Sequence, residues 1–139
     1  MRLATVTVVV DDYDEAIAHF VHDLGFVLRE DTPLGDGKRW VVVSPDPQHG
    51  AAILIARAAS PEQSAVIGRQ CGGRVSFFLH TESFDDDHER LLRNGVAVVD
   101  GPRVEEYGRV LVFRDRYGNR WDLIEPVSPN GASTGSPPA

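Results

Sequence analysis

Apolar residues follow two different spacings along the chain, and the spacing changes at turn-forming residues. Residues 3–10 are rich in β-branched types, as in a strand, and this run stops at Asp11. Apolar residues then recur at helical spacing over residues 12–24. Three further β-like runs follow over 26–29, 39–43 and 51–55. The pattern predicts one βαβββ module over residues 3–57.

The second half of the chain repeats this order. A linking helix is predicted over 61–70, because Ser60 can cap it and Pro61 suits its first position. A strand, a helix and three strands are then expected over 74–79, 83–94, 97–99, 109–114 and 120–125. These elements predict a second βαβββ module over residues 74–126.

A weak residue repeat supports the two modules: Tyr13-Asp14 matches Phe84-Asp85, and Gly25 matches Gly95 at nearly the same offset. We predict an α+β fold in which two tandem βαβββ modules form a single domain over residues 1–126. Their curved mixed sheets should surround a cavity, where ligands commonly bind. Residues 127–139 are rich in Gly, Pro and Ser, a composition that predicts a flexible C-terminal tail.

Composition and charge narrow the classes of partner. The chain has 139 residues, with 14 Lys plus Arg against 21 Asp plus Glu, and a formal net charge of −7. This acidic balance argues against nucleic acid and anionic membranes as partners. The apolar runs are far shorter than the roughly 20 residues that span a bilayer, and no signal-peptide pattern opens the chain. The single Cys71 excludes a multi-cysteine metal site, and we expect a cytoplasmic protein.

Two motifs resemble the vicinal oxygen chelate superfamily, which includes glyoxalase I, bleomycin resistance proteins and extradiol dioxygenases. The run from Val10 to Phe26 is similar to the family's first strand and helix, V-x-D-x-x-x-A-x-x-F-Y-x-x-x-L-G-F. The family's final turn and strand, F-x-D-P-x-G-N-x-x-E-L, resemble Phe113-Arg114-Asp115-Arg116-Tyr117-Gly118-Asn119-Arg120-Trp121-Asp122-Leu123. The resemblance covers residues 3–126 and implies the tandem-module fold and a homodimer.

The resemblance also implies a divalent metal held by histidine or glutamine and glutamate side chains of both modules. In this chain the family's ligand positions fall on Thr5, on Ile53 or its neighbours, on Arg74 and on Asp122. Of these side chains only that of Asp122 can bind a metal. We therefore predict that the protein needs no cofactor, while a divalent metal held by other residues stays open.

The five histidines do not occupy the family's ligand positions. His19 and His22 lie one turn apart, a spacing that can chelate a metal, but the apolar helix pattern places them on the opposite, exposed face. We interpret them as surface residues. A metal site built from His49 or His80 stays open as a minor alternative.

Arg74 and Asp122 should point into the same cavity if the strands keep the family's register. An ion pair between them would leave neither charge buried without a partner, and this is the interpretation we favour. The alternative is that Arg74 lies at the edge of the cavity and binds a ligand carboxylate or phosphate through two parallel hydrogen bonds.

Strand alternation selects the remaining candidates, since Ser76 and Phe78 share a face with Arg74, whereas Trp121 points away from Asp122. The predicted ligand-binding residues are Thr5, Thr7, Trp40, Ile53, Arg74, Ser76, Phe78, Tyr107 and Asp122. The candidates for acid–base catalysis are Asp122, Glu105 and Tyr107.

Three functions are compatible with these residues. The first, which we favour, is a metal-free binding protein of the bleomycin-resistance kind that sequesters a small cationic or aromatic molecule, as in antibiotic resistance. The second is an enzyme of the glyoxalase or dioxygenase kind with a shifted metal site or acid–base residues. The third is a structural or regulatory module whose cavity is filled by Arg74 and Asp122. The expected partners are a small-molecule ligand and a second copy of the chain.

Overall fold

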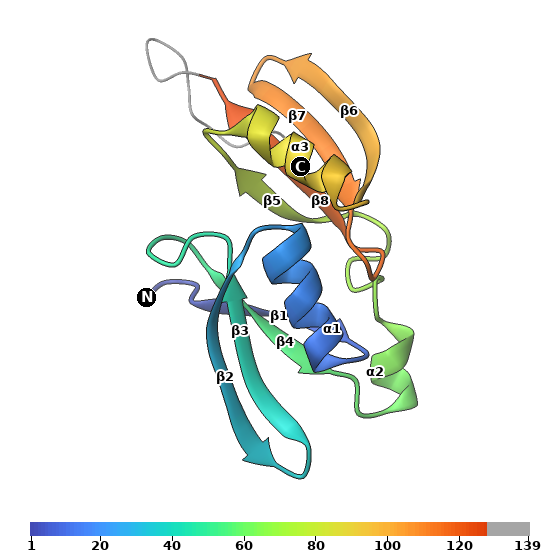
Figure 1. The fold of residues 1–139 in the computed structure, drawn as a ribbon. Helices are drawn as coiled ribbons and strands as arrows, with labels where there is room; N and C mark the ends of the chain where they lie inside the picture. Colours follow the sequence, from blue (N-terminus) through green and yellow to red (C-terminus); the bar gives the residue numbers. More distant parts are fainter. Residues whose placement is uncertain (128–139) are drawn as a thin grey trace. The chain divides into compact units, whose positions relative to one another are not determined.

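The computed structural model describes residues 1–127, and the chain divides into two compact units. The first unit comprises Met1–Gln70 and the second begins at Cys71. Each unit contains one four-stranded sheet with a helix against one face (Figure 1). The predicted tail over 127–139 lies outside the described residues except for Val127, whose amide donates to the carbonyl oxygen of Tyr107.

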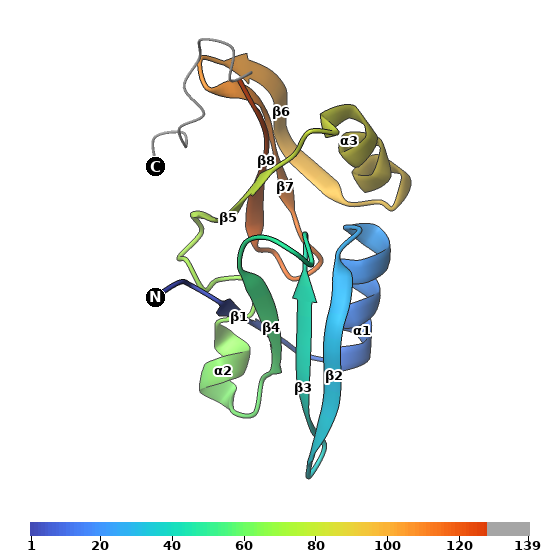
Figure 2. The same ribbon diagram turned by 90° about the vertical axis from the view of Figure 1, so that its left-hand side faces the viewer.

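The first unit is a βαβββ module followed by a short helix. Its elements are β1 (Thr5–Val10), α1 (Tyr13–Ala18), β2 (Val27–Gly35), β3 (Lys38–Ser44), β4 (Ala52–Arg57) and α2 (Pro61–Ala65). The strand order is β1-β4-β3-β2, with β1 parallel to β4 and the other pairs antiparallel. Figure 2 shows α1 along one face of this sheet.

The second unit repeats the arrangement. Its elements are β5 (Val75–His80), α3 (Phe84–Arg93), β6 (Ala97–Glu105), β7 (Gly108–Arg114) and β8 (Arg120–Pro126). The strand order is β5-β8-β7-β6, with β5 parallel to β8. The predicted α+β class is therefore confirmed: there are two mixed four-stranded sheets, neither of which closes into a barrel.

Two of the edge strands, β2 and β6, extend beyond their predicted ends. β2 continues through Pro33 to Gly35, and β6 continues through Pro102 to Glu105. An edge strand tolerates proline, because one row of its backbone amides has no neighbouring strand to donate to. Both strands also contain register shifts, at which the strand carries extra residues without a partner on the neighbouring strand.

The first predicted helix is shorter than expected and ends in a π-helical turn. Asp12 caps it as predicted, because its Oδ2 accepts from the Glu15 amide at 2.8 Å. From His19 the chain forms a π-helical turn, in which the Leu24 amide donates to the His19 carbonyl at 3.1 Å. This wider turn departs from the 3.6-residue period used to assign the helix faces.

The prediction that His19 is a surface residue is wrong. Its side chain is only 5% exposed, and its Nδ1 lies 2.9 Å from Asp23 Oδ2. Its ring also makes an edge contact with Phe20. His22 is exposed, as expected.

The core of the second unit is centred on Trp121, which is 1% exposed. Its ring lies 4.3 Å from that of Phe77 and stacks on Phe113, with centroids 5.9 Å apart. Because successive strand residues point to opposite faces, Asp122 is turned away from this core. The predicted orientation of Trp121 and Asp122 is confirmed.

Asp115 fixes the hairpin between β7 and β8. Its buried carboxylate accepts from the backbone amides of Tyr117, Gly118 and Asn119 at 2.9–3.0 Å. It also accepts from Asn119 Nδ2 at 3.0 Å and from Trp121 Nε1 at 2.9 Å. These bonds hold the start of β8, and they thereby set which of its residues face away from the helix.

Within residues 1–127, no helix is long and apolar enough to cross a membrane.

Candidate functional site

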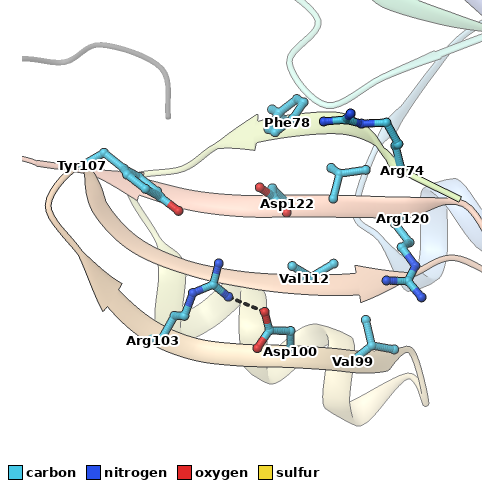
Figure 3. A pocket seen from close by; sticks show the side chains of 10 residues that line it. Arg74, Phe78, Val99, Asp100, Arg103, Tyr107, Val112, Arg120 and Asp122 are labelled. Atoms are coloured by element: carbon cyan, nitrogen blue, oxygen red, sulfur yellow. Dashed lines mark hydrogen bonds and ion pairs between the residues drawn. The ribbon is translucent and has the colours of Figure 1, made fainter. Parts of the chain in front are cut away.

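The face of the second sheet that points away from α3 carries an open groove of about 750 Å³ (Figure 3). All of its lining residues come from the second unit. They are Arg74, Val75, Phe78, Val99, Asp100, Arg103, Tyr107, Val112, Arg120 and Asp122. The groove therefore combines apolar walls with charged side chains of both signs.

Strand register aligns four of these side chains in a row across the sheet. Phe78 on β5 pairs with Asp122 on β8, Asp122 pairs with Val112 on β7, and Val112 pairs with Asp100 on β6. Register partners in neighbouring strands share a face of the sheet. The middle of the groove therefore contains a carboxylate beside an aromatic ring that is 50% exposed.

A bulge in β5 corrects the prediction for Ser76, which does not line the groove. Val75 pairs with Arg120 and Phe77 pairs with Trp121, so Ser76 is the extra residue between two aligned pairs. An inserted residue shifts the alternation of side chains by one position. As a result Val75 and Phe78 line the groove, although simple alternation would put them on opposite faces.

Arg103 is held in place by two carboxylates. Its Nη1 donates to Asp100 Oδ2 at 2.5 Å, and its Nε donates to Glu105 Oε1 at 2.8 Å. The bond to Glu105 is the largest cause of the raised pKa of Arg103. Glu105, a predicted acid–base candidate, is engaged by this arginine and does not line the groove.

Asp122 lies in the groove with an unsatisfied oxygen. Its Oδ1 is buried and has no hydrogen-bond partner among residues 1–127. Burial raises the pKa of Asp122 above its ordinary value; the positive charge of Arg103 opposes this shift, and the negative charge of Asp100 adds to it. Asp122 is therefore a carboxyl group poised to accept a hydrogen bond from a bound molecule.

The favoured ion pair between Arg74 and Asp122 is wrong: no such salt bridge forms within the described chain, and the cation that acts on Asp122 is Arg103. Arg74 precedes the first residue of β5, Val75, which pairs with Arg120 rather than with Asp122. Arg74 is exposed, so the cavity is not filled by an internal ion pair. The alternative position for Arg74, at the edge of the cavity, agrees with the structure.

Arg74 and Arg120 lie toward one end of the groove (Figure 3), and neither has a salt-bridge partner within residues 1–127. Val99, which is 40% exposed, lines the groove near Arg120. Tyr107, a predicted ligand-binding residue, lies at the other end of the groove. The two ends of the groove therefore differ in chemistry.

The predicted residues of the first unit divide into two groups. Thr5 and Trp40 line a smaller pocket of about 290 Å³, in which Trp40 Nε1 donates to Glu30 Oε2 at 2.6 Å. Thr7 does not line this pocket, and its carbonyl oxygen accepts from Gln70 Nε2 at 2.9 Å.

The prediction that Ile53 binds a ligand is wrong, because its side chain is 4% exposed and belongs to the core. Ile53 pairs with Val6 and Val43 on the helix side of the sheet, whereas Ala52 lines the pocket.

The side chains at the family's metal positions do not form a metal site. Ile53 is in the core and Arg74 is a cation, so Asp122 is the one metal-binding side chain of the set. Across residues 1–127, no three His, Cys, Asp or Glu side chains gather closely enough to hold a metal ion. The described residues therefore do not fit the family's metal.

The sequence prediction missed Asp100, Arg103 and Arg120 as groove residues. Arg120 could have been found, because it alternates with Asp122 on the same strand. Asp100 and Arg103 could not be found this way, since they follow the predicted end of their strand.

Comparisons with known proteins agree with this fold. The family model described as "Glyoxalase/Bleomycin resistance protein/Dioxygenase superfamily" matches residues 2–123. An uncharacterized protein of Shewanella frigidimarina is 49% identical over 121 residues, which are 86% of this chain and 90% of that protein.

Two solved structures are similar over most of both chains. UcmS2 is 31% identical with a TM-score of 0.77, and the match covers 90% of this chain and 98% of that one. TnmS3, described as an antibiotic binding protein from Streptomyces sp. CB03234, is 30% identical with a TM-score of 0.72. That match covers 91% of this chain and 96% of TnmS3.

Proposed function

Because the chain belongs to the glyoxalase/bleomycin resistance protein/dioxygenase superfamily, we propose that it binds a small aromatic molecule in the groove of its second unit, without a metal. The observation that carries this proposal is the open groove, in which a half-exposed Phe78 lies beside Asp122, whose Oδ1 has no hydrogen-bond partner among residues 1–127. An exposed aromatic ring inside a concave site offers a stacking surface to a planar ligand.

The similarity to TnmS3 supports a sequestering role, since that protein is described as binding an antibiotic. The absence of a fitting metal donor set among the described residues favours binding over the family's metal-assisted reactions. The charges of the groove change the expected charge of the ligand: Arg74 and Arg120 have no salt-bridge partner among residues 1–127, which favours a neutral or anionic ligand over a cationic one.

The assembly and the location of the protein are part of this proposal. We infer a homodimer from the family resemblance, and a cytoplasmic location from the single cysteine. Light scattering of the purified protein at several concentrations tests the dimer, and fractionation of the host cell tests the location.

The test of binding is a screen of aromatic antibiotics and other planar compounds, followed by calorimetric titration of each compound that binds. Replacing Phe78 with Ala should weaken binding by about tenfold, because the stacking surface is removed. The matched control is Leu92→Ala, which removes an exposed apolar side chain from α3 of the same unit.

Binding with Kd unchanged by EDTA and weakened by Phe78→Ala alone supports the proposal. Failure of every compound to bind the wild-type chain overturns it, as does equal binding by both variants. Loss of binding on adding EDTA would contradict its metal-free part.

Acid–base catalysis by Asp122 is a second candidate, favoured by the raised pKa of this carboxyl inside the groove. Mass spectrometry of each bound compound after incubation separates the two functions. A binding protein returns the compound intact, whereas an enzyme gives a product whose formation stops in Asp122→Asn.

A further inference from the structure

The charged side chains of the groove differ in whether the protein already provides them with partners. Arg103 already donates to Asp100 and Glu105. Arg74 and Arg120 line the groove without a salt bridge to any described residue. A guanidinium presents several N–H donors in one plane and pairs with a carboxylate through two parallel hydrogen bonds. The end of the groove with Arg74 and Arg120 is therefore suited to an anionic group.

The apolar neighbours of these arginines strengthen such an interaction. Val75 lies on β5 in register with Arg120, and Val99 lines the same groove from β6. Arg74 and Arg120 are themselves exposed, and the valines beside them offer contact to the apolar part of a ligand whose anionic group pairs with a guanidinium. Asp100 is held by Arg103, and neither Asp100 nor Asp122 forms a salt bridge with Arg74 or Arg120 in the described part of the chain.

Asp122 supplies a second point of recognition. Its buried Oδ1 is an acceptor without a donor among the described residues. A buried acceptor without a partner is unfavourable, and a hydroxyl or N–H of a bound molecule would remove that cost. The side chain opposite Asp122 on β5 is Phe78, whose half-exposed ring can cover one face of a planar ligand.

The distance between Arg120 and Asp122 indicates how far apart the two polar groups of a ligand should be. Arg120 and Asp122 are two residues apart on β8, so their side chains leave the same face of the sheet roughly 6.6 Å apart. Groups attached at opposite positions of one six-membered aromatic ring are separated by a similar distance. A ring placed on Phe78 would thus direct one substituent at Asp122 and the other at the arginines.

We propose that the ligand is an aromatic acid bearing a hydroxyl or similar donor across the ring from its acidic group. Arg74 and Arg120 bind the anionic group, Asp122 accepts from the donor, and Phe78 stacks on the ring. This inference rests on the proposed function and names the class of molecule that the groove selects.

Three matched probes test it: 4-hydroxy-1-naphthoate, 1-naphthol without the carboxylate, and 1-naphthoate without the hydroxyl. We expect 4-hydroxy-1-naphthoate to bind best, and each deletion to weaken binding by about tenfold, because each removes one charge-assisted hydrogen-bonding group. Isothermal titration with wild-type protein gives the three values of Kd.

Protein variants assign each effect to its residue. Arg74→Gln with Arg120→Gln should abolish the preference for 4-hydroxy-1-naphthoate over 1-naphthol. Asp122→Leu should abolish the preference for 4-hydroxy-1-naphthoate over 1-naphthoate, and it introduces the residue found at the matching position of the first sheet, Leu54. The control is Arg93→Gln, which removes a charge from the last turn of α3, outside the groove. Circular dichroism verifies that each variant is folded.

The outcomes separate this inference from the proposed function. Equal binding of the three probes, or preferences that survive in the variants, overturns the ligand class and leaves groove binding intact. Binding of other planar compounds with no binding of these probes has the same meaning. If no planar compound binds at all, the proposed function itself has failed.

Discussion

The two modules are alike on the helix side of their sheets and different on the concave side. In the first module Arg39 on β3 donates to Asp14 at the start of α1 at 2.8 Å, and its guanidinium lies 5.2 Å from the centre of the Tyr13 ring. In the second, Arg109 on β7 donates to Asp85 at the start of α3 at 2.9 Å and lies 4.3 Å from the centre of Phe84. The same three-residue contact thus holds each helix to its sheet.

The rows of register partners on the concave faces of the two sheets differ between the modules. In the first sheet the row is Thr7, Leu54, Val42 and Glu30, and in the second it is Phe78, Asp122, Val112 and Asp100. The β3 and β2 positions keep their character in β7 and β6, whereas the β1 and β4 positions become aromatic and acidic in β5 and β8. The larger hollow, about 750 Å³ against about 290 Å³, accompanies these changes.

This difference indicates which positions of a duplicated fold must keep their side-chain chemistry and which can change. Positions that pack a helix on a sheet keep their chemistry in both copies, because losing a buried contact destabilises the module. Exposed positions on the concave face, such as Phe78 in the second sheet, can change without that cost. A functional site is therefore to be sought where the copies differ, which here is the row containing Asp122.

The greatest loss of stability is expected at the hairpin between β7 and β8, which is held by the buried carboxylate of Asp115. Asp115→Ala removes the acceptor of five hydrogen bonds and should cost about 3 kcal/mol of unfolding free energy. Asp46→Ala is the matched control, because Asp46 lies in the corresponding connection of the first module and is exposed. Urea denaturation measures both, and equal losses would contradict this account.

A smaller loss of stability is expected at the contact that the two modules share, which Arg39 makes with α1 and Arg109 makes with α3. Arg39→Met and Arg109→Met each remove a cation–π contact and partly exposed salt bridges, so each should lower the urea midpoint by less than Asp115→Ala does. Hydrogen exchange should show faster opening of α1 in the first variant and of α3 in the second. A loss confined to one variant would show that the two contacts are not equivalent.

The smallest effect concerns the pH dependence of stability. Burial raises the folded-state pKa of Asp122 above 3.8, so ionisation of Asp122 destabilises the folded state. The folded chain is penalised as pH rises from about 3.8 through the folded pKa, and no penalty exists below this window. Asp122→Asn should therefore raise Tm by roughly 1–3 °C near neutral pH.

Thermal denaturation of wild type and Asp122→Asn at roughly pH 3 and pH 7 checks this sign. The difference should vanish at the lower pH, where both side chains are neutral. A difference that is the same at both values would assign the effect to packing rather than to charge.

Much of the fold follows from the hydrophobic pattern, because its two periods locate strands and helices without knowledge of their neighbours. The opposite orientations of Trp121 and Asp122 came from strand alternation alone. The regular periods failed where the backbone departs from them. The bulge at Ser76 breaks the two-residue period of β5, and the π-helical turn at His19 breaks the 3.6-residue period of the helix, so each shifts the face on which a side chain lies. Such insertions depend on tertiary packing and leave no clear mark in the pattern.

The candidate site was predictable only in part for a similar reason. Phe78, Arg74, Tyr107 and Asp122 were found, but the partner of each charge was not. Ion pairing depends on register between strands that are distant in sequence, which is why Arg103 rather than Arg74 acts on Asp122. Side-chain chemistry at single positions was thus easier to predict than the pairing between them.

The site of binding can be located by NMR mapping of a bound ligand on the amide spectrum of the full chain, with the first planar compound that binds. We expect the largest shift changes at Phe78, Val112 and Asp122 of the second sheet. Changes centred instead on Thr7 and Leu54, at the matching positions of the first sheet, would contradict this expectation.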